Sequence, residues 1–138
     1  MLVLRDPASA SSIADPEIRD LVEKLFVTIC DGEPYEIEQH GYMIIVEPGD
    51  TVEDLERESS CPILRNRNND VRYDQPEFAP SFEFVSEHSN CYEMVFVIGD
   101  NGYGVDFFIP KTGGIDAELL ALCARQQAAP CGPHIRAN

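Results

Sequence analysis

His88 and Cys91 lie three residues apart in one expected turn, flanked by Glu87 and Glu93. A thiol becomes a nucleophile when a nearby base or cation favours the thiolate, and histidine supplies that group in cysteine hydrolases. Here the neighbouring carboxylates disfavour a thiolate, because like charges repel. The pair therefore supports only the alternative interpretation of the chain, a small-ligand binding domain or cysteine-dependent enzyme that uses Cys91 and His88.

Other patterns that could carry chemistry are incomplete. The sequence contains no G-x-S-x-G, P-loop, H-E-x-x-H or G-x-G-x-x-G motif. Gly99, Gly102 and Gly104 lie between two expected strands, so they predict a hairpin rather than a phosphate-binding loop. Cys131 and His134 lack a second pair of ligands for zinc. We therefore predict no catalytic residue, no metal site and no cofactor, and favour a non-enzymatic protein.

Acidic residues are concentrated in one stretch of the chain. Residues 31–58 contain ten Asp and Glu against Arg57 alone, a net charge of −9 in 28 residues. Such density opposes folding through mutual repulsion, and it also steers a basic protein to its binding site. A solvated, solubilising face is the plainer interpretation. The functional interpretation is a partner-binding surface, and eight of these residues are predicted to form it: Glu36, Glu38, Glu47, Asp50, Glu53, Asp54, Glu56 and Glu58.

The composition excludes several classes of protein. The 138 residues carry a net charge of −15, which argues against direct binding to nucleic acid or to an anionic membrane. No apolar run approaches the roughly 20 residues of a membrane span. The five cysteines are widely spaced and odd in number, and the first residues do not form a signal peptide. These features predict a protein of the cytoplasm.

A long connection separates the two halves of the chain. Residues 59–81 show no clear periodicity and contain Arg65, Arg67 and Arg72. These cations form either a contact for a small anion or an internal tether onto the acidic face. Loops of this length are uncommon in compact domains.

Hydrophobic periodicity places the remaining elements. Asp15 and Pro16 start a helix that ends at Asp31 and Gly32. Thr51 and Asp54 have capping-box spacing at the start of a second helix. The expected helices span 16–30, 51–58 and 117–127, and the expected strands span 35–38, 42–46, 82–85, 92–98 and 103–109. Residues 1–14 are expected to be a loose lead-in and residues 128–138 a flexible tail.

This order predicts an α+β fold. A single domain spans 1–138, with an ordered core over 15–127 and the order α-β-β-α-(loop)-β-β-β-α. We expect a two-layer sandwich, in which a mainly antiparallel sheet of about five strands has its helices packed on one face. A homo-oligomer that extends this sheet through the hairpin of residues 92–109 is a third interpretation.

One stretch resembles a group of known proteins. Residues 82–123, FEFVSEHSNCYEMVFVIGDNGYGVDFFIPKTGGIDAELLALC, resemble small uncharacterised acidic proteins carried on bacterial plasmids and integrative elements. The resemblance implies an accessory role in the biology of mobile elements, and it carries over no functional residue. Together with the acidic residues of 31–58, the resemblance favours one function. The chain would bind and inhibit a basic, DNA-acting protein, in part by mimicking DNA.

Overall fold

The computed structural model describes residues 1–59, 81–97 and 104–128. Within these ranges the helices are η1 (Pro7–Ser12), α1 (Pro16–Cys30), α2 (Ile37–His40), α3 (Val52–Ser59) and α5 (Ala117–Ala128). The strands are β1 (Leu2–Leu4), β2 (Tyr42–Ile45), β3 (Ser81–Glu87), β4 (Cys91–Val97) and β5 (Gly104–Pro110).

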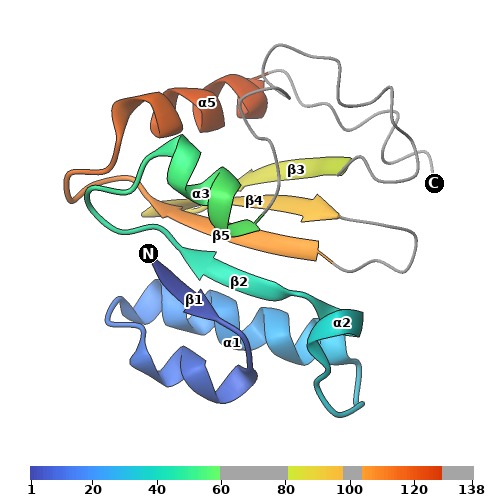
Figure 1. Ribbon diagram of the computed structural model, residues 1–138. Helices are drawn as coiled ribbons and strands as arrows, with labels where there is room; N and C mark the ends of the chain where they lie inside the picture. The colour runs from blue at the N-terminus through green and yellow to red at the C-terminus, as the bar shows by residue number, and fades with distance from the viewer. Residues whose placement is uncertain (60–80, 98–103, 129–138) are drawn as a thin grey trace.

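The five strands form one mixed sheet in the order β1-β2-β5-β4-β3 (Figure 1). Only β2 and β5 run parallel, and the other three neighbouring pairs are antiparallel. The prediction of an α+β fold with a mainly antiparallel sheet is therefore confirmed. The expected hairpin turn at residues 99–102, most of the 59–81 loop and nearly all of the tail lie outside the described residues.

Helices cover both faces of the sheet, so the expectation that they pack on one face is wrong (Figure 1). The reason lies in the central strands, which are apolar on both sides. Phe107 packs with α3 and α5 residues, whereas its neighbour Phe108 packs with α1. Successive side chains in a strand point to opposite faces, so two buried phenylalanines in a row require a cover on each side.

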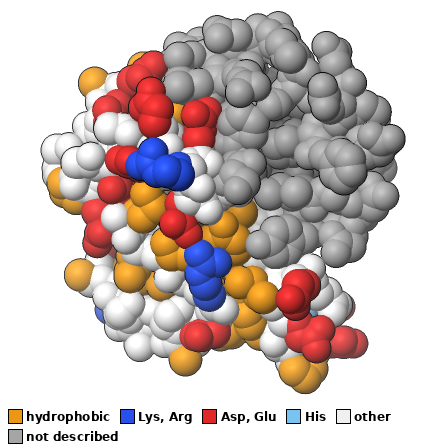
Figure 2. All heavy atoms as spheres, in the orientation of Figure 1, with side chains coloured by type: hydrophobic (Ala, Val, Ile, Leu, Met, Phe, Trp, Pro, Cys, Tyr) orange, Lys and Arg blue, Asp and Glu red, His pale blue; other side chains and the backbone are white. Residues whose placement is uncertain are grey.

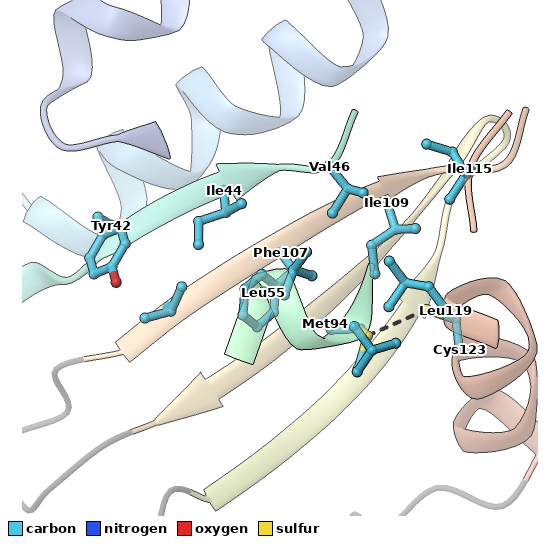
Figure 3. Packing of buried hydrophobic residues seen from close by; sticks show 12 residues of the cluster. Tyr42, Ile44, Val46, Leu55, Met94, Phe107, Ile109, Ile115, Leu119 and Cys123 are labelled. Atoms are coloured by element: carbon cyan, nitrogen blue, oxygen red, sulfur yellow. Dashed lines mark hydrogen bonds between the residues drawn. The ribbon is translucent and has the colours of Figure 1, made fainter. Parts of the chain in front are cut away.

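On the face of the sheet that α3 and α5 cover, the buried residues form a single hydrophobic cluster (Figure 3). Leu55 of α3 and Leu119 of α5 are fully buried against the strand residues Ile44 and Phe107. Cys123 Sγ lies 3.3 Å from Met94 Sδ in the same cluster. On the other face, Ile18, Val22 and Phe26 form the buried stripe of α1.

Local capping signals predict the helix starts correctly. Asp15 accepts hydrogen bonds from the amides of Glu17 and Ile18 at the start of α1. Thr51 and Asp54 form the expected reciprocal box at α3, where each backbone amide donates to the other side chain. Hydrogen bonds from Thr51, with the charge of Arg57 added, lower the pKa of the Asp54 carboxyl.

Two of the expected local elements are different in the structure. The predicted strand at 35–38 is replaced by the short helix α2, in which the Glu36 amide donates to His40 Nδ1 at 3.0 Å. This local bond satisfies an amide that would otherwise need a strand partner. The expected lead-in contains β1, which pairs antiparallel with β2 and buries Leu4.

Candidate partner-binding surface

The ten acidic residues of 31–58, eight of which are predicted to bind the partner, fall into two groups in space. We call Asp31, Glu33, Glu36 and Glu38 the α2 group, because they lie on α2 and on the chain that leads into it. We call Glu47, Asp50, Glu53, Asp54, Glu56 and Glu58 the α3 group, because they lie on α3 and on the connection before it. Figure 2 shows acidic side chains at the upper left and, separately, over α2 at the lower right, with basic and hydrophobic side chains between them.

Internal cations already neutralise much of the α3 group. The N-terminal ammonium of Met1 lies 2.9 Å from Glu47 Oε1 and 3.0 Å from Asp50 Oδ2. Arg5 is 2.6 Å from Glu58 Oε2. Asp54 has Arg57 as its ion-pair partner. Glu53 is exposed and Glu56 is half-buried on the same helix. At least four of the six members therefore form ion pairs within the domain, in addition to any role toward a partner.

The α2 group has a different environment. All four side chains are exposed. Within the part of the chain that the structure describes, Asp31, Glu33 and Glu36 form no ion pair with Lys or Arg. Asp31 ends α1 with a left-handed φ of 48°, where the helix itself carries partial negative charge. Among the described residues, three exposed acids without a Lys or Arg ion pair therefore lie together at this end of α1.

The structure does not support Cys91 as a nucleophile. The residue is fully buried in the core beneath α1. Burial, followed by the charges of Glu17, Glu93 and Asp15, raises the pKa of its thiol to about 12. His88 closes the β3–β4 turn through its backbone amide, and its ring nitrogen Nε2 lies 3.1 Å from Glu93 Oε1. A thiolate at Cys91 is thus disfavoured by both burial and charge.

Thiol reactivity tests this conclusion directly. Cys91 and Cys123 are fully buried, and burial raises the pKa of each thiol to about 12, whereas Cys30 is partly exposed. In the native protein, we expect iodoacetamide to modify Cys30 faster than Cys91 or Cys123 by about a hundredfold or more. Peptide mass mapping across a pH series measures each rate. Rapid modification of Cys91 with a midpoint well below pH 8 would contradict this conclusion and favour the cysteine-dependent enzyme.

A pair of carboxyl groups on neighbouring strands was not predicted from the sequence. Asp106 of β5 is partly buried, and Glu93 of β4 leaves only 14% of its side chain exposed. Burial, together with the charge of Glu93 and a hydrogen bond to it, raises the pKa of the Asp106 carboxyl. A proton shared between the two groups avoids placing two anions side by side. The sequence feature that could have revealed this pair is Asp106 itself, because it is a single acid within the apolar run of β5.

The described part of the chain shows neither a membrane-spanning helix nor a metal-binding cluster. No helix in residues 1–59, 81–97 or 104–128 is long and apolar enough to cross a membrane. In those same ranges, no three or more His, Cys, Asp or Glu side chains are grouped to hold a metal ion. Comparisons with family models, with curated proteins and with solved structures gave no match.

Proposed function

We propose that this chain is a non-enzymatic, acidic protein-interaction domain that binds a strongly basic protein and inhibits it. The supporting observation is the excess of ten acids over one base in residues 31–58, part of which is left without internal counter-charges. A basic partner relieves the repulsion among these carboxylates when it binds. A protein that acts on DNA fits best, because such proteins present basic surfaces to phosphates and the carboxylates compete for them.

The pattern of ion pairs favours the α2 group as the first contact of the partner. Charges that are already paired gain little from a new counter-ion, whereas unpaired exposed charges act at longer range. In the part of the chain that the structure describes, Asp31, Glu33 and Glu36 meet this condition, and Glu38 extends the same surface. The members of the α3 group that have internal partners contribute to the field of the domain and less to direct contact.

The setting proposed for this interaction is the cytoplasm. The three described cysteines, Cys30, Cys91 and Cys123, are free thiols, which suits a reducing compartment. The resemblance of residues 82–123 to proteins of plasmids and integrative elements suggests that the partner is a host protein that acts on DNA.

Charge-reversal variants distinguish the contributions of the α2 group and the α3 group to partner binding. We expect Glu33→Lys with Glu36→Lys to weaken binding of the basic partner by about tenfold or more, because both carboxylates are exposed and neither has a Lys or Arg partner among the described residues. The matched variant, Glu53→Lys with Glu56→Lys, changes net charge equally and should weaken binding less. Asp54 and Glu58 are left unchanged because they cap α3 and pair with Arg5. The measurement is the amount of basic protein that each variant retains from a lysate of the source cell.

The outcomes of this comparison are distinct. Circular dichroism checks that both variants keep the fold. Unchanged retention by both variants would contradict the proposed function. An equal loss in both would contradict the leading role of the α2 group, because net charge alone would then govern binding.

A further inference from the structure

An apolar pocket lies beside the α2 group. Its volume is about 530 Å³, within the range of roughly 300–1,000 Å³ that is typical of ligand sites. The C-terminal half of α1 and the chain that leads into α2 supply most of its lining. The residues that matter for its chemistry are Phe26, Val27, Cys30, Tyr35, Glu23 and Glu33.

Aromatic contacts hold the walls of this pocket in place. Phe26 is buried, and its ring meets that of Tyr35 edge-on at 5.4 Å between centroids. The hydroxyl of Tyr35 donates to the carbonyl oxygen of Gly41, and its ring stacks on His40 at 5.8 Å. A wall fixed in this way loses little conformational freedom when a ligand binds.

Val27 is the feature that favours a ligand in this pocket. Its side chain is 73% exposed, and among the described residues no other large hydrophobic residue is exposed. A single exposed apolar residue is ordinary on a protein surface. Here, however, the exposed residue lines a preformed apolar pocket, so a ligand that covers it removes its apolar surface from water.

The charge around the pocket selects the kind of ligand. Glu23 and Glu33 line it, and the described residues place neither in an ion pair with Lys or Arg. Residues 25–56 contain no Lys or Arg at all. The C-terminal end of α1 adds partial negative charge. An anionic ligand is therefore repelled, and an apolar group flanked by cations is attracted.

We propose that this pocket receives an apolar side chain of the basic partner, with flanking Lys or Arg residues of that partner against Glu23 and Glu33. This inference rests on the proposed function and adds the anchor through which binding occurs. An apolar centre with a charged rim is the arrangement of protein interfaces in which one buried side chain dominates affinity. A small molecule of the same character, a primary ammonium that carries a phenyl ring, is the competing occupant, and the same experiment distinguishes it.

The test uses the full chain with Cys61→Ser and Cys131→Ser, so that Cys30 reports on the pocket. The probes are an amidated peptide, Lys-Arg-Phe-Leu-Arg-Lys, its control Lys-Arg-Ser-Ser-Arg-Lys of equal charge, and phenethylamine. We expect the Phe-Leu peptide to bind about tenfold or more tightly than its control, because it alone buries apolar side chains. It should also slow the modification of Cys30 by iodoacetamide.

Variants locate the binding site of the peptide. Val27→Gln should remove the preference for the Phe-Leu peptide, whereas Thr28→Gln, on the same helix and outside the pocket, should keep it. Glu23→Gln with Glu33→Gln should weaken both peptides, and Glu53→Gln with Glu56→Gln, on the opposite face of the sheet, should weaken them less.

Failure of the inference differs from failure of the proposed function. Equal affinity for the two peptides, or a preference that survives Val27→Gln, overturns the pocket as an anchor, even where the domain still retains a basic protein from lysate. Protection of Cys30 by phenethylamine but not by either peptide also overturns it, in favour of a small-ligand site. Loss of lysate retention alone, with peptide preference intact, overturns the proposed function and not the pocket.

Discussion

Replacing Gly41 with alanine should destabilise the fold by more than about 3 kcal/mol, among the largest effects expected of a single substitution. Gly41 ends α2 and leads into β2 with a φ of 77°. A Cβ built there would lie 2.1 Å from the carbonyl oxygen of Gly104 and 2.9 Å from its backbone nitrogen. Because these are backbone atoms of β5, relief requires the parallel β2–β5 pairing to open.

Gly49 provides the matched control for this effect. Its φ is 94°, so alanine is strained there too, but a Cβ would meet nothing within 4 Å. Gly49→Ala should therefore cost only about 1–2 kcal/mol, the price of the left-handed conformation alone. Urea denaturation of both variants measures the difference. Equal stability of the two variants would contradict the close packing of Gly41 against β5.

Asp106→Asn should stabilise the protein at neutral pH by about 1 kcal/mol or more, because each pKa unit by which the folded state disfavours the charged carboxylate corresponds to about 1.4 kcal/mol. In the wild type, ionisation of the Asp106 carboxyl places a second negative charge beside Glu93 in a desolvated site. An asparagine amide can donate a hydrogen bond to Glu93 at any pH, whereas the Asp106 carboxyl must first bind a proton. His88 also contacts Glu93, with its Nε2 3.1 Å from Glu93 Oε1.

The contribution of Asp106 to stability falls as the pH rises. The folded state raises the pKa of the Asp106 carboxyl above its ordinary value of 3.8, so it binds this proton more tightly than the unfolded chain does. The stability from this group is therefore fully present below pH 3.8 and is lost as the pH rises through the raised value. Asp106→Asn should flatten this part of the profile.

Urea denaturation between pH 4 and pH 8 measures the effect. Glu53→Gln is the control, because it removes an equal charge from an exposed position. If Asp106→Asn is no more stable than this control at neutral pH, the two carboxyl groups do not share a proton in the folded protein.

Capping residues in the sequence predicted the starts of two helices correctly, whereas the alternation at 35–38 wrongly predicted a strand. The starts of α1 and α3 depend on side chains within three residues of the amides that they cap, so Asp15 and Thr51 were sufficient to place them. β1 was missed because a strand of three residues has no stability of its own, and its partner β2 begins some forty residues later. The division of the helices between two faces depends on the pairing of β2 with β5, which no local pattern encodes.

The candidate surface was predicted by residue type but not by environment. The eight acids are exposed or half-buried, as expected of charged residues. Which of them keep their charge unpaired depends on distant residues: Arg5 reaches Glu58 across 53 positions, and Met1 reaches Glu47 and Asp50. The pocket beside Val27 likewise requires α1 and Tyr35 to be placed in space before it exists.

The central claim is that the acidic surface binds a basic protein, and salt-dependent capture tests it most directly. The full chain is immobilised, exposed to a lysate of the source cell at low salt, and eluted with a salt gradient while mass spectrometry identifies each protein released. We expect one basic protein to leave at a defined step, because screening within about 8–10 Å at ordinary ionic strength removes the attraction between exposed charges. Retention of nothing above background would contradict the claim and leave the negative charge with a solubilising role alone.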